Sequence, residues 1–493
     1  MALQLDEKAL RGVVEEVLAR LAKPPSAASP AANAAPAARP AAPAVIASSG
    51  KRYGVFDTAQ EATAAAARAF EQLREKGIAA RRAVVDIVKR LATANAEAWG
   101  RFEYEETKIG RLDHKIEKLK IVKLVPGVEW IQPRGMSGDH GITMEEFTPV
   151  GVVAAILPVT HSIPTLSGNI INIVAAGNAV VFNPHPGGAR SAALAVRAYN
   201  EAIEREIGIE NLVCTVEKPS LESFDALCKS ADVGLICVTG GPAVVNAAMK
   251  SGKRAICAGP GNPPVLVDDT VDPDKAARDI IAGASFDNNL LCIGEKQVFV
   301  LDRMAGALIR GLEKAGAAQL SASQIEKLAA AAFTMKPDAG GCSHPVLNRE
   351  LVGKDAAVLA KYAGTTVADK VPLLFGETAA DHAFVMEEQM MPMLPIVRVK
   401  SVEEGIALAK KSEHGYKHSA IIHTLNVNHM TAMARALDTT LFVKNGPSVA
   451  GLGLGGEGYL SYSIATTTGE GITNPQTFTR TRRCVMVDNL RIY

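Results

Sequence analysis

A cysteine in a polar, glycine-containing segment is the residue of this chain best suited to covalent chemistry. Cys292 lies in segment 284–296, between a pair of asparagines and a glycine, and a strand-like run follows at 297–300. Sulfur is a strong nucleophile as a thiolate, so a cysteine at the entrance of a strand could form a covalent intermediate. The alternative is a buried structural cysteine, the commonest state of a free thiol. The segment alone leaves both interpretations open.

A glycine-containing turn offers a place for an anion. Thr239, Gly240, Gly241 and Pro242 lie between a predicted strand and a predicted helix. Glycines let the backbone approach a ligand, and a helix N-terminus favours an anion such as a pyrophosphate. The turn lacks the complete G-x-G-x-x-G pattern, so a plain tight turn stays an alternative.

Two further patterns lack parts that phosphate or metal binding needs. The glycine-rich stretch 451–461 has no Gly-Lys-Ser/Thr ending, so we interpret it as a flexible loop that allows close approach rather than an ATP site. His414 and His418 have no acid between them, which is a poor zinc pattern. We therefore expect no bound metal.

The elements that must position these residues alternate between strands and helices. The predicted strands cover 151–159, 179–182, 211–216, 233–238, 254–256 and 297–300, and the predicted helices between them cover 162–176, 191–206, 220–230 and 244–250. This order is typical of a parallel sheet with helical crossovers, an α/β domain of nucleotide-binding type. A long helical stretch at 57–104 precedes them, and Gly77 predicts a break within it.

Composition excludes several classes of protein. The 493 residues carry 53 Lys and Arg against 52 Asp and Glu, so charge gives no reason to expect binding to nucleic acid or to an anionic membrane. The longest apolar runs are far shorter than the roughly 20 residues that a membrane helix needs. The seven cysteines are scattered without paired spacing, which predicts no disulfide framework and favours a reducing compartment.

The first 50 residues differ from the rest of the chain. Residues 1–22 place their apolar side chains on one helical face and their charges on the other, and residues 23–50 are rich in alanine and proline. A helix this short is marginal alone in water. We predict a docking helix on a flexible linker, and the alternative is a first helix that packs on its own domain.

Five separated segments resemble one enzyme family when they are taken together. They are ASFDNNLLCIGEK at 284–296, AGPGNPP at 258–264, EEQMMPMLP at 387–395, HGYKHSAIIH at 414–423 and GLGLGGEG at 451–458. Their types and order resemble the aldehyde dehydrogenase superfamily, in particular the CoA-acylating propionaldehyde and acetaldehyde dehydrogenases of bacterial microcompartments. The resemblance covers about residues 51–493, and the predicted docking helix and linker also fit it.

The resemblance implies that Cys292 is the nucleophile. Its thiolate would add to an aldehyde carbonyl, a hydride would leave to NAD, and CoA would take the acyl group from the resulting thioester. Hydrolytic relatives carry a glutamate in a Glu-Leu-Gly-Gly segment, and the corresponding segment 258–262 has no acid here. The expected product is therefore acyl-CoA. Release of free acid, transfer to phosphate, and a non-catalytic scaffold of the microcompartment remain alternatives.

The resemblance also implies where the developing alkoxide finds donors. His161 stands where the superfamily usually has an asparagine, and a neutral imidazole N–H could serve in its place. His161 could equally titrate near neutral pH or merely line the pocket. The backbone N–H of Cys292 is a further donor, and Asn169 is a weaker candidate.

By the same resemblance, the cofactor and substrate sites draw on nine residues. Those expected to bind NAD are Thr239, Gly240, Gly241, Pro158 and Glu388, with Glu388 holding the nicotinamide ribose unless it is an exposed acid. Those expected to form a small apolar substrate pocket are Phe286, Ile293, Thr160 and Met390. Segment 182–186 lacks the acid that would separate NAD from NADP, and we expect NAD.

The resemblance predicts a subunit of three parts behind the docking helix. A Rossmann-type nucleotide-binding domain would cover 51–262, interrupted by a hairpin at 125–147, and an α/β catalytic domain would cover 263–445. Residues 446–493 would join the hairpin in a β oligomerisation arm, with Trp130, Ile131 and 478–493 buried in a partner subunit. We expect a homodimer or homotetramer in the lumen of a microcompartment within the cytoplasm, bound to shell proteins through 1–22.

Overall fold

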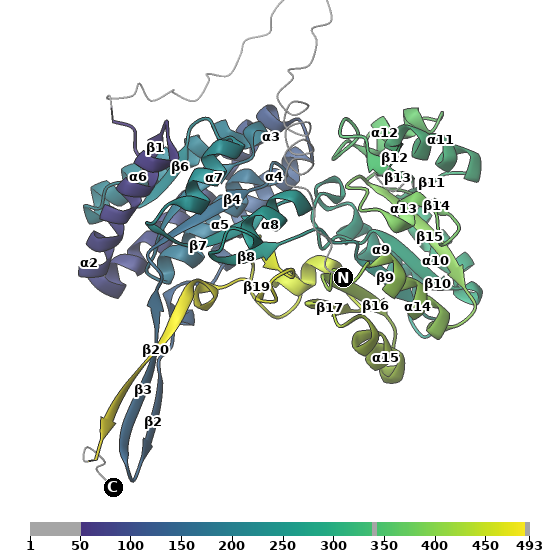
Figure 1. Cartoon of the computed structure of the whole chain (residues 1–493). Coiled ribbons are helices and arrows are strands. Elements are labelled where there is room, and N and C mark those ends of the chain that lie inside the picture. The colour runs from purple at the N-terminus through teal and green to yellow at the C-terminus, as the bar shows by residue number, and fades with distance from the viewer. Residues whose placement is uncertain (1–50, 338–342, 489–493) are drawn as a thin grey trace, which may run out of the picture. The chain divides into compact units, whose positions relative to one another are not determined.

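The first half of the described chain forms a parallel sheet with helical crossovers, as its apolar runs predict. The computed structural model describes residues 51–337 and 343–488 (Figure 1). The predicted docking helix and linker lie outside these residues. The strand order is β1-β6-β5-β4-β7-β8, and every pairing is parallel. The strands are β1 (Val55–Phe56), β4 (Val152–Leu157), β5 (Ala179–Pro184), β6 (Val213–Val216), β7 (Val233–Thr239) and β8 (Arg254–Ala258).

Helices that bury one apolar face pack against this sheet. The long helix α2 (Ala59–Ala94) contacts α5 (Ser162–Ala175) and β6, and it is interrupted at Gly77, whose φ of 69° is left-handed. The predicted break is thus confirmed, because this conformation favours glycine. The other helices of this half are α3 (Ala96–Thr107), α4 (Leu112–Lys120), α6 (Ala189–Ile207), α7 (Leu221–Lys229) and α8 (Pro242–Met249).

A second parallel sheet follows in the chain. Its strand order is β11-β14-β15-β10-β9-β16-β17, and again every pairing is parallel. The strands are β9 (Pro264–Val267), β10 (Gln297–Leu301), β11 (Ala318–Gln319), β14 (Leu374–Glu377), β15 (Met393–Val399), β16 (Ser419–His423) and β17 (Leu441–Lys444). Its helices are α9 (Pro273–Ala284), α10 (Asp302–Lys314), α11 (Ala322–Ala332), α12 (Ala356–Tyr362), α13 (Ala383–Met386), α14 (Val402–Ser412) and α15 (Val427–Leu437). Two antiparallel ribbons, β12 (Phe333–Pro337) with β13 (Ser343–Leu347) and β18 (Ile464–Ala465) with β19 (Gly471–Ile472), complete this part of the chain.

Each large sheet has its own hydrophobic core, and the cysteine segment lies where the two cores meet. Phe286, Leu291 and Ile293 belong to the core of the first sheet, and Cys292 packs against it. The strand β10 begins a few residues later and belongs to the core of the second sheet. Residues between these cores are therefore held from both sides.

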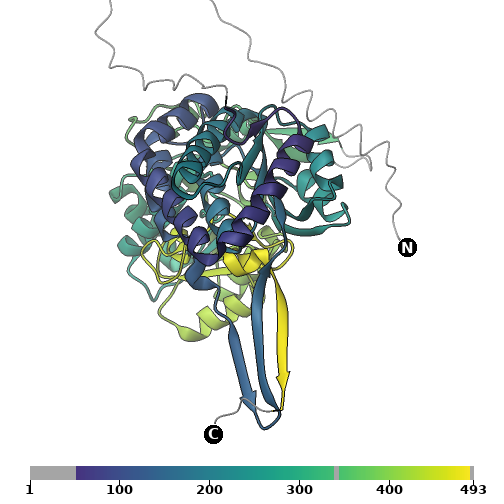
Figure 2. The same cartoon turned by 90° about the vertical axis from the view of Figure 1, so that its left-hand side faces the viewer.

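A third, antiparallel sheet projects from the rest of the described residues (Figures 1 and 2). It consists of β2 (Arg134–Gly138), β3 (Gly141–Pro149) and β20 (Thr479–Val487), with β3 in the middle. The strand predicted near the C-terminus is thus confirmed, and the predicted hairpin starts later than expected. Trp130 ends the short 3-10 helix η2 (Val128–Trp130), and its ring lies 5.0 Å from the ring of Tyr459. Trp130 and Ile131 therefore precede the hairpin: Trp130 belongs to the 3-10 helix and contacts Tyr459, and the first strand of the hairpin begins only at Arg134.

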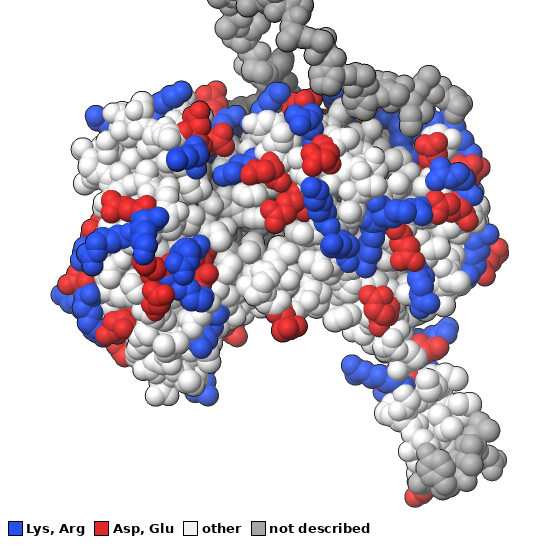
Figure 3. Space-filling model, turned by 180° about the vertical axis from the view of Figure 1, so that it is seen from behind, with Lys and Arg blue, Asp and Glu red and all other residues white. Residues whose placement is uncertain are grey.

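Charges of both signs are interspersed on the face of the molecule that Figure 3 shows. This distribution agrees with the nearly balanced charge of the sequence. Within the described residues, every helix is too short or too polar to cross a bilayer.

Candidate active site

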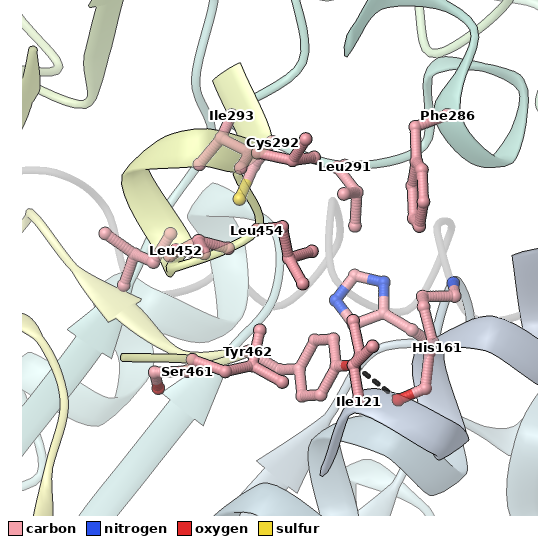
Figure 4. Close-up of a pocket in the computed structure, with 14 residues that line it drawn as sticks. Ile121, His161, Phe286, Leu291, Cys292, Ile293, Leu452, Leu454, Ser461 and Tyr462 are labelled. Carbon is pink, nitrogen blue, oxygen red and sulfur yellow. Dashed lines mark hydrogen bonds between the residues drawn. The ribbon is translucent and has the colours of Figure 1, made fainter. Parts of the chain in front are cut away.

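A small cavity lies beside Cys292 (Figure 4). Its volume is about 20 Å³, where a single water needs about 10–15 Å³ on the same scale. Four stretches of chain line it: residues 118–121 at and just after the end of α4, His161, the cysteine segment, and a C-terminal stretch from 449 to 464. The lining residues are Lys118, Ile121, His161, Phe286, Leu291, Cys292, Ile293, Val449, Leu452, Leu454, Leu460, Ser461, Tyr462 and Ile464. Most are apolar, so the cavity suits a small molecule with little polar surface.

The cavity gathers four of the residues that the sequence singled out and leaves two aside. Cys292, His161, Phe286 and Ile293 all line it, whereas Thr160 and Met390 are not among its lining residues. Figure 4 shows the sulfur of Cys292 directed toward Leu452 and Leu454, with the imidazole of His161 near Phe286 and Tyr462.

Burial raises the pKa of the Cys292 thiol to about 12, and the charge of Glu388 acts in the same direction. The ammonium of Lys296 and the backbone N–H groups of Cys292 and Ile293 act against this rise. The thiol is therefore protonated at neutral pH and must lose its proton before it can attack. The same N–H groups lie where they can also bond to an oxyanion formed at this sulfur.

The turn that precedes Cys292 has an unusual backbone. Asp287, Asn288 and Asn289 lie in succession in the left-handed region, with φ angles of 49°, 55° and 64°. Such conformations are unfavourable for residues with a side chain and persist where the surroundings hold them. Here each side chain is tied down: Asp287 accepts from the N–H of Arg111 (2.8 Å), Asn288 donates to Asp355 (2.7 Å) and Gly353 (2.9 Å), and Asn289 donates to the carbonyls of Ala284 (2.8 Å) and Glu295 (2.9 Å).

Four charged side chains are buried together next to this turn. We call Glu103, Lys115, Lys118 and Asp287 the buried ionic cluster, and each is at most 1% exposed. Lys115 lies 3.0 Å from Glu103 and 3.9 Å from Asp287, and Lys118 bonds to Asp287. These contacts lower the pKa of Asp287 to about 2, despite burial. Asp287 is therefore ionised at neutral pH.

His161 follows β4 and immediately precedes α5. It is buried, and its Nδ1 has no hydrogen-bond partner among the described residues. Burial lowers the pKa of His161 well below its usual range, and the charges of Lys118 and Lys115 act in the same direction. The imidazole is therefore neutral near pH 7, which leaves it able to donate one N–H toward the cavity. This favours a donor role over titration near neutrality.

A second group of buried polar residues links the turn before Cys292 to the residues that follow it and to Ser448. We call Asn289, Glu295, Lys296 and Ser448 the downstream polar cluster. Glu295 accepts from both the N–H and the hydroxyl of Ser448, each at 2.7 Å, and Lys296 donates to the carbonyl (2.8 Å) and side chain (2.5 Å) of Asn289. Because Ser448 begins the 3-10 helix η5 (Ser448–Leu452), this cluster attaches one wall of the cavity to the cysteine segment.

Gly261 lies against Cys292, in the segment 258–262, which contains no acid. A Cβ at this position would lie 2.7 Å from the carbonyl oxygen of Cys292 and 2.8 Å from Cγ of His418. The close approach requires glycine. The Nε2 of His418 is buried and has no partner among the described residues.

The glycine-containing turn stands at the carboxyl end of β7. Gly241 is the N-cap of α8 without a side-chain cap, and a Cβ there would have no neighbour within 4 Å. The space beside Gly241 is therefore open, whereas the N–H of Gly240 donates to the carbonyl of Ala258 (3.3 Å). Thr239 bonds to Ser463 (2.7 Å), whose hydroxyl donates to Oδ1 of Asn169 (3.0 Å). The buried Nδ2 of Asn169 has no partner among the described residues, so Asn169 stays a candidate donor.

Glu388 and Pro158 complete the predicted cofactor residues. The carboxyl of Glu388 is close enough to Cys292 and Lys296 for their charges to interact, and burial raises its pKa. Pro158 directly follows β4, at the same edge of the first sheet as Thr239. Within the residues that the structure describes, no three His, Cys, Asp or Glu side chains gather as metal ligands.

Sequence reasoning missed Lys118, Tyr462 and the C-terminal wall of the cavity. Tyr462 donates to the carbonyl of Lys118 (2.6 Å), which closes the cavity on the side opposite Cys292 (Figure 4). The apolar spacing of Leu452, Leu454 and Leu460 within a glycine-rich stretch was the available signal.

This fold and site define the class of the protein. The model of the aldehyde dehydrogenase family matches residues 33–458, and the chain belongs to that family. Within it, the chain is 44% identical over 448 residues to acetaldehyde dehydrogenase (acetylating) EutE of Salmonella typhimurium, which covers 90% of this chain and 95% of the relative.

Two solved structures are similar over most of their length. A propionaldehyde dehydrogenase of Rhodopseudomonas palustris, with bound CoA and an acylated cysteine, is 41% identical with a TM-score of 0.86, covering 90% of this chain and 100% of that one. A propionaldehyde dehydrogenase from the fucose utilisation bacterial microcompartment of Clostridium phytofermentans is 42% identical with a TM-score of 0.86, covering 89% and 100%.

Proposed function

We propose that this chain is a CoA-acylating aldehyde dehydrogenase that converts a short aliphatic aldehyde, CoA and NAD to acyl-CoA and NADH. The observation that carries the proposal is the small apolar cavity at Cys292, whose described lining contains no acid. Propionaldehyde is the proposed substrate. Acetaldehyde is expected to react as well, because one methylene changes discrimination by only about 1–3 kcal/mol.

Cys292 and His161, which line the cavity, have different roles in the proposed reaction. After its proton has passed to solvent, the sulfur of Cys292 adds as a thiolate to the aldehyde carbon, and the resulting oxyanion takes hydrogen bonds from the neutral His161 and the N–H of Cys292. When bound, the nicotinamide accepts the hydride that leaves this carbon. The acyl group then remains on Cys292 as a thioester until the thiol of CoA attacks it and the sulfur leaves.

The surroundings of Cys292 favour a thiol over water as the acyl acceptor. Gly261 leaves no room for a side chain in the segment that carries the hydrolytic glutamate of relatives. Glu295 accepts hydrogen bonds from Ser448 with both of its oxygens, and Glu388 is the proposed ribose ligand. A water molecule near the thioester therefore lacks a free base.

The residues on the cofactor side fit a nicotinamide dinucleotide. The N-terminus of α8 has no side-chain cap at Gly241, and a Cβ at Gly241 would have no neighbour within 4 Å, so there is room for a diphosphate at this helix end. The carboxylate of Glu388 near Cys292 suits two ribose hydroxyls. Thr239 and Pro158 would border the same edge of the first sheet.

The deciding experiment measures NADH formation with and without CoA. We expect sustained turnover only with CoA and about one NADH per active site without it, because the acyl group then stays on the enzyme. The variant Cys292→Ala should form no NADH. Equal sustained turnover without CoA would indicate the hydrolytic alternative, and an unaffected Cys292→Ala variant would overturn the whole assignment.

We assign the parts of the subunit by the same reasoning. Residues 51–262 carry the nucleotide site, residues 263–445 carry Cys292, and residues 446–493 serve both the cavity wall and the arm. The arm exposes Met136, Val485 and Val487 at 48%, 56% and 69%, which favours burial against a second copy of this chain. Light scattering should give a homodimer or homotetramer, and a monomer would contradict this assignment.

We assign residues 1–22 to docking on the shell proteins of a bacterial microcompartment, with the enzyme in its lumen. Support comes from the amphipathic pattern of 1–22, the linker at 23–50, and the microcompartment source of one similar structure. Deletion of residues 1–22 should leave activity in solution intact and abolish co-packaging with shell proteins. Loss of activity on deletion would show that the helix belongs to the enzyme body.

A further inference from the structure

Two members of the buried ionic cluster form hydrogen bonds to the backbone on both sides of His161. Lys115 donates to the carbonyl of Thr160, the residue before His161, and also to Glu103 (3.0 Å). Glu103 accepts from the N–H of Ile163 (2.8 Å), two residues after His161. The loop that carries His161 is therefore fixed by two charged side chains from α3 and α4.

The same cluster also contacts the turn 287–289, which precedes Cys292, because Asp287 is a member of both. The carboxylate of Asp287 accepts hydrogen bonds from the ammonium of Lys118 and from the N–H of Arg111. The Nζ of Lys115 lies 3.9 Å from Oδ2 of Asp287. Asp287 is also the first of the three left-handed residues before Cys292. Its charged bonds therefore hold the turn in a conformation that its backbone does not favour.

Stability alone does not account for four buried charges. Desolvating ions is costly, and apolar residues of similar volume often give a fold that is equally or more stable. Charge-assisted hydrogen bonds, however, fix distances and directions that apolar contacts leave free. The cluster joins two loops that are more than a hundred residues apart in the sequence and that both reach the cavity.

We propose that Lys118 and Asp287 are positioning residues, whose ion pair sets Cys292 against His161 for attack on the aldehyde. This inference rests on the proposed function, and it predicts that acylation of Cys292 is the step that depends on the pair. The charged or titratable groups that face His161 are Lys115 and Lys118 of α4, Asp287 of the turn, Glu103 of α3, and Cys292 and Tyr462 across the cavity.

The test compares Asp287→Asn, Lys118→Met and the double variant with wild type in the full-length enzyme. The rate of the first NADH turnover per active site should fall about 100-fold in each single variant, because small misplacements of reacting groups have effects of this size. The KM for aldehyde should change far less than this rate. The double variant should be no slower than the singles, because one pair is broken in all three.

A second readout does not depend on catalysis. Iodoacetamide labelling of Cys292, resolved by peptide mass spectrometry, should become about tenfold faster in each variant, because the turn that buries the thiol loosens. Asp268→Asn is the matched control, since Asp268 is equally buried but bonds to Thr270, Thr424 and His429 at the far end of β9. It should leave both readouts at wild-type values.

The outcomes separate the proposal from the function on which it rests. A double variant whose loss is the product of the single losses, or unchanged labelling of Cys292, would overturn the positioning role. An equal loss in Asp268→Asn would do the same. If Asp287→Asn does not fold, Lys118→Met decides by the same two readouts. A wild-type enzyme that needs no CoA would overturn the proposed function, while the labelling result would still judge the ion pair.

Discussion

Two buried polar clusters lie near Cys292, and they differ in whether their charged groups are paired with opposite charges. In the buried ionic cluster before it, each charge lies within 4.0 Å of an opposite one. In the downstream polar cluster, Glu295 and Lys296 bond to neutral groups of Ser448 and Asn289. Among the described residues, neither has an oppositely charged partner within that distance.

The pKa values follow from this difference. The neighbouring ammonium groups hold the pKa of Asp287 at about 2, whereas burial raises the pKa of Glu295 to about 7. Burial also lowers the pKa of Lys296. Burial lowers the pKa of Lys118 in the first cluster as well. The charge of Asp287 is therefore fixed near neutral pH, whereas the charge of Glu295 responds to pH in this range.

The largest effect should come from breaking the ionic cluster at Glu103. The variant Glu103→Ala leaves the ammonium of Lys115 buried without this partner, and we expect a loss of about 3–5 kcal/mol in the free energy of unfolding. Urea-induced unfolding of variant and wild type measures the difference. Glu97→Ala on the same helix α3 is the matched control, because Glu97 and Lys120 form an exposed ion pair 3.4 Å apart. Its loss should stay under about 1 kcal/mol. Equal losses in the two variants would contradict the contrast between paired buried charge and surface charge.

The next effect is a pH dependence that belongs to Glu295. Its pKa is raised from 4.5 in the unfolded chain to about 7 in the fold, so the folded state binds the proton more tightly. The stabilisation is full below pH 4.5 and is lost as pH rises toward 7. As pH rises from 4.5 to about 7, the free energy of unfolding of wild type should therefore fall by roughly 3 kcal/mol relative to that of Glu295→Gln.

Urea unfolding of both proteins across this pH range measures that difference, and other titrating groups cancel in the comparison. A constant difference from pH 4.5 to pH 8 would show that Glu295 does not titrate in the fold. A difference of opposite slope would show that its carboxylate is stabilised there by a charge.

The sequence predicted the elements that depend on local pattern. The apolar run before Thr239, the glycines after it and the apolar helix that follows were sufficient for the strand, the turn and α8, because these depend on neighbours in the chain. Cys292 and His161 were found by their segments. Phe286 and Ile293 lie in the same segment as the cysteine, and both line the cavity.

The pairing of charges in the buried ionic cluster could not be predicted from the sequence, because the partners are far apart in the chain. Lys115 and Lys118 lie in the segment LDHKIEKLK, whose composition is typical of an exposed helix. Their burial follows from Asp287, which lies about 170 residues away, and nothing in the local pattern indicates it. For the same reason Thr160 and Met390 were expected in the cavity, whereas the wall is made by Leu452, Leu454 and Leu460 of the C-terminal stretch.

The smallest effect should come from Ser448, which links the downstream polar cluster to the cavity wall. Ser448→Ala removes the hydroxyl donor to Glu295 but keeps the backbone donor, so we expect a loss of about 1 kcal/mol at pH 8. The pKa of Glu295 should rise further, because one bond to its charged form is lost. Combining this variant with Glu295→Gln tests the link directly. The two effects should be less than additive, because both act through the same contact, and additive effects would show that Ser448 acts on the wall independently of Glu295.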